Sequence, residues 1–199
     1  DIFPERFDTC LEGLRKVHGD KVKVDNERKF VGFDAYQKVI DSGVDVVLLA
    51  TPPFFRPLHL EAAINAGKHI FCEKPVAVDA PGIRKVIELA KVAKEKNLSL
   101  VSGFCWRFHE PKRAVFGKIN DGSIGEVMSI YNTYYTGGAW NFPRQTGWSD
   151  MEFQLRNWMY YTWLAGDHIV EQAVHRNDMM SWAIGDVLPV CSVGTGGRQ

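Results

Sequence analysis

Two groups of polar residues in this 199-residue sequence could do acid–base chemistry. The first centres on Lys74, which stands between Glu73 and Pro75 directly after the apolar run His69–Cys72. If that run is a buried strand, the ammonium group is partly desolvated, which lowers the pKa of a lysine. Such a lysine can exchange a proton near neutral pH or stabilise an alkoxide. A solvated Glu–Lys pair at a turn is the alternative that the spacing alone leaves open.

The second group consists of His168, Glu171, His175 and Asp178, which are spaced three, four and three residues apart. On a single helix this spacing places all four side chains on one face. A carboxylate one turn before a histidine can orient the ring and raise its basicity, so His175 could be a general base oriented by Glu171. A solvent-facing polar stripe is one alternative. A metal site is another, which the order of the ligands disfavours, so no metal is predicted.

Helix and strand patterns alternate over the first hundred residues. The run from Val44 to Ala50 is almost continuously Val and Leu, as in a parallel strand buried on both faces. Further strands are expected over residues 69–72 and 98–102, and a short one over 22–24, with helices between them. A long helix is expected from Asp79, a candidate N-cap, to Lys96. This alternation predicts a parallel sheet with helices on both faces, and ligands bind beyond the carboxyl ends of such strands.

The pattern changes after about residue 120. Residues 125–135 are rich in β-branched and aromatic side chains, and we expect a strand of an antiparallel sheet there. Another strand is expected over 190–193, with helices over 152–164 and 167–184 between the two. The division that follows is a parallel α/β domain over residues 1–120 and part of an α+β domain, with a mainly antiparallel sheet, over residues 121–199.

Composition excludes several classes of protein. Charged residues make up 24% of the chain and balance to a formal net charge of zero, whereas a nucleic-acid-binding protein needs an excess of Lys and Arg. No apolar run approaches the roughly 20 residues that span a bilayer. The cysteines at positions 10, 72, 105 and 191 are widely spaced, which indicates free thiols in a reducing compartment. We therefore expect a cytoplasmic protein.

Three motifs resemble the family of glucose–fructose oxidoreductase and inositol 2-dehydrogenase, called Gfo/Idh/MocA. They are Thr51-Pro52-Pro53 with His59 in the next helix, Glu73-Lys74-Pro75, and the helix with Glu171, His175 and Asp178 that ends in Trp182-Ala183-Ile184-Gly185. The resemblance implies a nicotinamide-dependent oxidoreductase with a doubly wound Rossmann-type sheet. It also implies that a first strand and a glycine-rich phosphate-binding loop precede Asp1 and that more of the second sheet follows Gln199, so this piece alone is expected to be inactive.

The resemblance also implies roles for individual residues. Lys74 and His175 match the catalytic pair, and Glu171 stands where the family often has Asp. The expected cofactor contacts are Asp1, Thr51, Pro52, Glu73, Lys74 and Arg107. The expected substrate contacts are His168, Asp178 and Trp140. An acid at position 1 would bind the ribose hydroxyls and repel a 2′-phosphate, so NAD is expected rather than NADP.

The expected reaction is oxidation of a secondary alcohol of a sugar, sugar acid or cyclitol by hydride transfer to the nicotinamide. His175 would take the hydroxyl proton, Glu171 would orient His175, and Lys74 would stabilise the alkoxide. One alternative is NAD-dependent glycoside hydrolysis by transient oxidation and elimination; another is a sugar-responsive binding protein without turnover. The expected partners are a small carbohydrate and further copies of the protein in a dimer or tetramer, with neither nucleic acid nor membrane.

Overall fold

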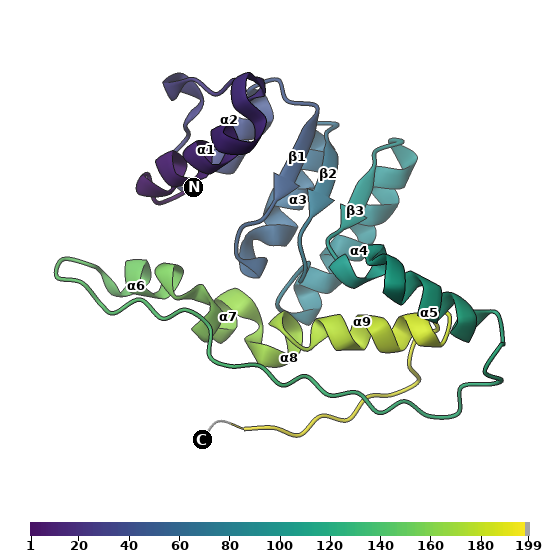
Figure 1. The fold of residues 1–199 in the computed structure, drawn as a ribbon. Coiled ribbons are helices and arrows are strands. Elements are labelled where there is room, and N and C mark those ends of the chain that lie inside the picture. The colour runs from purple at the N-terminus through teal and green to yellow at the C-terminus, as the bar shows by residue number, and fades with distance from the viewer. Residues whose placement is uncertain (198–199) are drawn as a thin grey trace.

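The computed structural model describes residues 1–197, and its framework is a parallel sheet of three strands (Figure 1). The strands stand in the order β1 (Val46–Leu49), β2 (His69–Cys72) and β3 (Leu100–Ser102). Helix α3 (Arg56–Asn65) connects β1 to β2, and α4 (Ala80–Glu95) connects β2 to β3. The predicted βαβ alternation and the Rossmann-type α/β class are confirmed.

Local sequence signals explain where these connecting helices begin and end. The Asp79 carboxylate accepts a hydrogen bond of 2.7 Å from the backbone N–H of Gly82 and caps α4, as predicted. Pro57 and Pro81 lie in the first turns of α3 and α4, where a missing N–H is tolerated. Gly67 ends α3 with a φ of 70°, a conformation that other residues rarely adopt.

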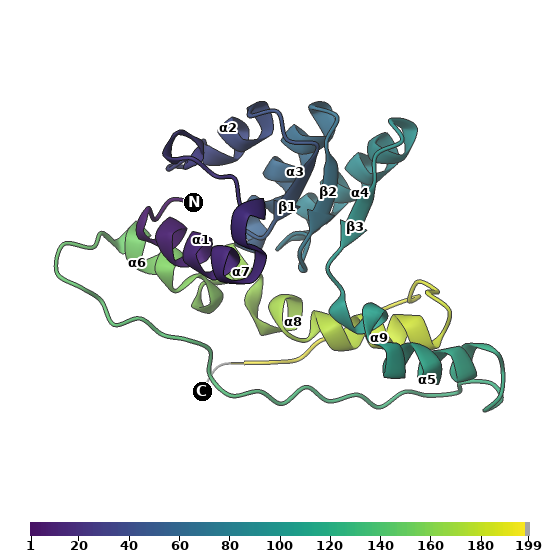
Figure 2. The same ribbon diagram turned by 45° about the horizontal axis from the view of Figure 1, so that its top comes forward.

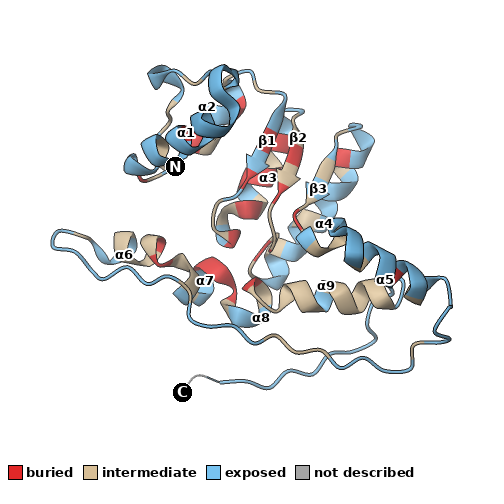
Figure 3. Cartoon of the chain, in the orientation of Figure 1, coloured by how far each residue is buried: buried red, intermediate tan, exposed pale blue. Residues whose placement is uncertain are grey.

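The core lies between the sheet and one layer of helices. Apolar side chains of β1 and β2 pack against α3 and α4, and the buried residues concentrate there (Figure 3). Along β1 the exposure alternates, since Val47 is 5% exposed and Leu48 is 74% exposed. The prediction that this strand is buried on both faces is therefore wrong for residues 1–197, because α3 and α4 pack together on the same face of the sheet.

The segment before β1 is helical and irregular. It contains α1 (Glu5–His18) and α2 (Ala35–Asp41), with 3-10 turns over Gly19–Lys21 and Asn26–Arg28. Residues 22–24, expected as a strand, pair with no strand in the described chain. A strand needs a neighbour for its ladder hydrogen bonds, so an apolar alternation alone does not produce one.

After β3 the chain is helical with long extended connections. The helices are α5 (Glu110–Asn120), α6 (Asp150–Arg156), α7 (Thr162–Ala165), α8 (Asp167–Glu171) and α9 (Val174–Ala183). Residues 125–135 and 190–193 form no strand, which corrects both strand predictions. The reason is the same as for residues 22–24: within residues 1–197 neither segment has a neighbouring strand to bond with.

Both helices predicted in this part are interrupted. The helix expected over 152–164 is divided into α6 and α7 by a 3-10 turn at Trp158–Tyr160, and the helix expected over 167–184 is divided into α8 and α9. Other 3-10 turns cover Pro53–Phe55 and Cys105–Phe108. The boundary predicted at residue 120 coincides with the end of α5, but the division into two domains stays a prediction.

A second apolar cluster joins the N-terminal residues to helices α6 and α7. Phe3 packs with Leu155 and Leu164, and Glu5 pairs with Arg156 at 2.7 Å. Helix α1 accordingly lies beside α6 and α7 (Figure 2). The helices beyond the extended connection therefore return to the N-terminal residues, close to the carboxyl end of β1. Among the described residues, no helix combines the length and apolar character needed to cross a bilayer.

Candidate active site

The ends of the three strands bring the predicted motifs to one edge of the sheet. The N–H of Glu73 donates to the carbonyl of Leu49 at 3.0 Å, and the N–H of Gly103 donates to the carbonyl of Cys72 at 2.8 Å. A Cβ atom at Gly103 would lie 2.6 Å from Glu73 Oε2. Glycine at this position therefore lets the loop after β3 pass close to Glu73.

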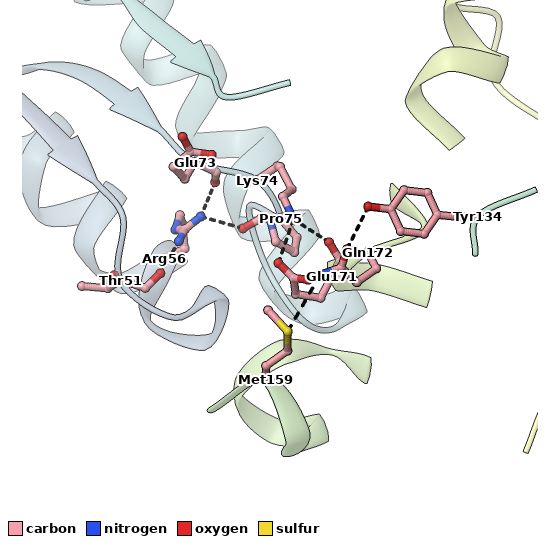
Figure 4. A network of polar contacts seen from close by, with 9 residues as sticks. All are labelled: Thr51, Arg56, Glu73, Lys74, Pro75, Tyr134, Met159, Glu171 and Gln172. Carbon is pink, nitrogen blue, oxygen red and sulfur yellow. Dashed lines mark hydrogen bonds and ion pairs between the residues drawn. The ribbon is translucent and has the colours of Figure 1, made fainter. Parts of the chain in front are cut away.

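Lys74 contacts a helix that lies 97 residues further along the chain. Its Nζ is 2.7 Å from Glu171 Oε1 and also donates to the Glu171 carbonyl at 2.7 Å (Figure 4). The two side chains are 13% and 6% exposed, so the ion pair is largely shielded from water. The Lys74–Pro75 peptide bond is cis.

This contact coincides with the break between α8 and α9. In a continuous helix the Glu171 carbonyl would accept a hydrogen bond from the N–H of His175. Here the N–H of His175 is directed to the carbonyl of Gln172, at 3.4 Å, and Lys74 bonds the Glu171 carbonyl instead. The Gln172 side chain in turn accepts from the Tyr134 hydroxyl at 2.9 Å. At the break between α8 and α9, the Lys74 ammonium thus replaces the backbone N–H that would otherwise donate to the Glu171 carbonyl.

His175 lies half-buried in the first turn of α9, with its ring centroid 6.4 Å from that of Trp106. Burial lowers its pKa, the charge of Lys74 lowers it further, and Glu171 and Glu73 act in the opposite direction. The ring is therefore neutral at pH 7, the form that a general base requires. Its buried Nδ1 and the buried Oε2 of Glu171 have no hydrogen-bond partner within residues 1–197. The predicted orienting bond between Glu171 and His175 is not formed within residues 1–197: the carboxylate binds Lys74 through Oε1, and its Oε2 stays without a partner.

Arg107 and Asp178 form a separate ionic cluster. Arg107 Nε is 2.8 Å from Asp178 Oδ1, and its Nη2 is 2.6 Å from Asp186 Oδ1. The guanidinium also lies over the Trp182 ring, 5.5 Å from the centroid. Burial raises the pKa of Asp178, and Arg107 counteracts this. The cluster fixes the chain after β3 against α9, so these two side chains are bound to each other in this structure.

A cavity of ≈420 Å³ runs along β1 to its carboxyl end. It brings together three of the residues predicted to contact a cofactor: Asp1, Thr51 and Pro52. Asp1 Oδ1 accepts a hydrogen bond of 2.9 Å from the N–H of Phe3, which holds the carboxylate in place. The remaining wall is mostly apolar. A carboxylate beside an apolar cavity at a strand end fits the ribose diol and flat base of a nucleoside.

His59 supports the wall of this cavity. It is 6% exposed, its ring stacks on that of Tyr36 at 4.2 Å, and its Nδ1 is 3.2 Å from Thr51 Oγ1. Burial, assisted by the charge of Arg56, lowers its pKa to about 4. The folded protein therefore holds this ring neutral at a pH where the unfolded chain would protonate it.

Acid should destabilise the protein through His59. Between pH 6.5 and about 4 the unfolded state binds one more proton than the folded state, so the free energy of unfolding falls as the pH falls. The loss attributable to this ring should reach about 2–3 kcal/mol. Urea denaturation at pH 4.5 and 7.5 should show a smaller pH effect in His59→Phe than in wild type. An exposed-histidine control, His18→Gln, should keep the wild-type difference, and an equal pH effect in His59→Phe would contradict this assignment.

Two predicted substrate residues, His168 and Trp140, form no hydrogen bond with Lys74 within residues 1–197. His168 is exposed on α8, whereas Glu171 on the same short helix is buried. The prediction that the four polar residues share one face of a single helix is wrong, because the helix is interrupted between Glu171 and His175. Trp140 packs on Trp158 and donates to the carbonyl of Arg156 at 3.4 Å.

Sequence reasoning also missed Trp106 beside His175, and buried Arg56. The only sign of Arg56 in the sequence was a charged residue within the otherwise apolar Phe-Phe-Arg-Pro stretch that follows a strand. Within residues 1–197, no three His, Cys, Asp or Glu side chains form a group that could hold a metal.

Comparison with known proteins shows what this chain is similar to. Residues 13–104 match the GFO_IDH_MocA family, which is described as an oxidoreductase family with an NAD-binding Rossmann fold. Inositol 2-dehydrogenase of Pseudomonas fluorescens is 39% identical over 127 residues, or 62% of this chain and 35% of that protein. Residues 13–104, just under half of the chain, are therefore similar to the NAD-binding Rossmann domain of the Gfo/Idh/MocA oxidoreductases.

Other known proteins match a longer part of the chain. Inositol 2-dehydrogenase of Rhizobium meliloti is 27% identical over 184 residues, which is 92% of this chain and 52% of that protein. The WlbA dehydrogenase of Bordetella pertussis, solved with NADH and UDP-GlcNAcA, superposes with a TM-score of 0.63 at 21% identity. That superposition covers 92% of this chain and 46% of the other, and it shows a shared fold. The chain spans about a third to a half of the length of these relatives.

Proposed function

We propose that this chain is part of an NAD-dependent dehydrogenase that oxidises a secondary alcohol of a cyclitol or sugar. The observation that carries the proposal is the contact of Lys74 Nζ with Glu171 at 2.7 Å. It joins the Glu-Lys-Pro motif after β2 to the helix pair that holds His175. Two relatives that bear the name inositol 2-dehydrogenase support a cyclitol as the substrate class.

Three residues have separate roles in the proposed oxidation. His175, neutral because its pKa is lowered, takes the proton of the substrate hydroxyl. Lys74 stabilises the negative charge that develops on the same oxygen. Glu171 holds the ammonium in place, which differs from the sequence prediction that it orients the histidine. The oxidised nicotinamide, when bound, supplies the hydride acceptor.

The cofactor preference depends on the cavity along β1. Asp1, Thr51 and Pro52 line it, and Glu73 and Lys74 follow the neighbouring strand. We infer that Asp1 binds the adenosine ribose hydroxyls, since a carboxylate in that place accepts from a diol and repels a 2′-phosphate. Arg107 is committed to Asp178 and Asp186, so we assign it and Asp178 to holding α9 rather than to ligand contact.

The test is a screen of cyclitols and sugars with NAD and with NADP, following absorbance of the reduced cofactor. We expect one NADH per substrate oxidised and a preference for NAD. Asp1→Ser should weaken the preference about 10- to 10²-fold, the effect of losing a charged hydrogen bond. Asp20→Ser, at an exposed turn, is the control. Substrate loss without net NADH would contradict the dehydrogenase and favour transient oxidation, and an unchanged preference in Asp1→Ser would contradict the role of Asp1.

A further inference from the structure

Arg56 is a buried cation whose hydrogen bonds go to the backbone. It is 2% exposed, in the first turn of α3. Its Nη1 donates to the carbonyls of Glu73 and of Pro75, the latter at 3.0 Å, and its Nη2 donates to the carbonyl of Thr51 (Figure 4). Buried arginines are ordinarily paired with carboxylates. Within residues 1–197, the oxygen atoms that accept hydrogen bonds from this guanidinium are all backbone carbonyls.

The three acceptors are not scattered. Two of them belong to the residues on either side of Lys74. The third belongs to Thr51, which follows β1 and lines the cavity. One rigid group therefore spans the ends of two neighbouring strands. The planar fork of an arginine can do this, whereas the ammonium of a lysine is a single point of donation. Loop carbonyls in this environment need a donor, and Arg56 supplies it for both loops.

The charge of Arg56 is consistent with this location. Burial lowers its pKa, and Cys72 and the carboxylates of Glu73 and Glu171 counteract the effect. The guanidinium therefore lies within electrostatic range of the carboxylate that binds Lys74. Arg56 contributes a fixed positive charge near the loop that carries Lys74. It does not face the cavity along β1, since it is not one of the residues that line that cavity.

We propose that Arg56 is the positioning residue of the active site: it clamps the loops after β1 and β2 so that Lys74 is directed at Glu171. The proposal rests on the proposed function, because its effect is read through turnover. It assigns Arg56 no contact with substrate or cofactor. Loss of the clamp lets the backbone on both sides of Lys74 move, and misplacement of a reacting group by about 1 Å costs up to 10²-fold in rate.

The experiment compares Arg56→Lys and Arg56→Met in the whole protein. Lys96→Met is the matched control, because Lys96 Nζ also donates to a carbonyl, that of Ile64 at 3.0 Å, but at the opposite end of the sheet. The kcat is measured per NADH-binding site, so that misfolded molecules are not counted. We expect a decrease of about 10- to 10²-fold in Arg56→Met, a smaller decrease in Arg56→Lys, and a value within twofold of wild type in Lys96→Met.

The outcomes separate the clamp from a merely structural role. A structural role would lower the number of binding sites and leave kcat per site unchanged, and that result in either Arg56 variant overturns the proposal. Should Arg56→Met fail to fold, Arg56→Lys decides, because it keeps the charge and loses the fork. Lys74→Met identifies a failure of the proposed function itself: if that variant turns over like wild type, the assignment of the reaction is wrong whatever Arg56 does.

Discussion

Replacement of Lys74 by methionine should lower kcat by about 10²–10⁴, and replacement of His175 by asparagine should have an effect of the same size. The ammonium is the cation that the structure places beside Glu171, where a developing alkoxide would be stabilised most in a shielded environment. Lys74→Arg should also be impaired, because the broader guanidinium cannot fill the position of an ammonium that contacts two oxygens of one residue. Steady-state production of NADH measures all three variants.

Lys85→Met is the control for this series. Lys85 forms an ion pair with Glu61 at 2.6 Å, but both side chains are well exposed and lie on the connecting helices α3 and α4. Its kcat should stay within twofold of wild type. Wild-type turnover in Lys74→Met or in His175→Asn would remove the acid–base and alkoxide roles and leave only the Rossmann-type framework.

The second large effect concerns stability. Glu171→Leu leaves the ammonium of Lys74 shielded from water without its counter-charge, and breaking a buried pair in this way costs about 3–5 kcal/mol. The double variant Lys74→Met/Glu171→Leu should recover most of that loss, because neither charge is then buried alone. Urea denaturation of the wild type, both single variants and the double variant gives the coupling free energy.

The exposed pair Lys85–Glu61 again provides the comparison. Removing one of its partners should change the free energy of unfolding by about 0–1 kcal/mol, as for other surface pairs. A change equally small in Glu171→Leu would mean that Lys74 reaches solvent readily, and it would contradict the view that the contact holds α8 against the loop after β2.

The parallel part of the fold could be predicted from the sequence because its signals are local. The apolar run ending at Ala50, the cap at Asp79 and the helix terminator at Gly67 each act within a few residues. Together they fix the alternation of strands and helices, and with it the edge of the sheet where Lys74 stands. Strand pairing is not local. Residues 125–135 have a strand composition, yet no strand forms there, because the partner that would complete the ladder is absent from residues 1–197.

The sequence predicted which residues belong to the candidate site better than it predicted which contacts they make. The spacing of three and four residues suggested that Glu171 orients the His175 ring, since both side chains would lie on one face of a single helix. In the structure Lys74 takes both the carboxylate and the carbonyl of Glu171, and the helix is interrupted at that point. Arg56 escaped notice for a related reason: its acceptors are backbone carbonyls, which every residue has, so no pattern of side chains marks them.

The amino-acid sequence by itself determined the motifs, the βαβ order and the strand end that carries Lys74, because helix caps, apolar periodicity and turn residues act over short distances. Only the tertiary structure decided which partner each charged group has. Lys74 meets Glu171 across 97 residues, Arg107 meets Asp178 across 71, and Arg56 bridges two strand ends. Such pairings depend on which surfaces are buried against each other, and burial is a property of the packed chain rather than of any segment.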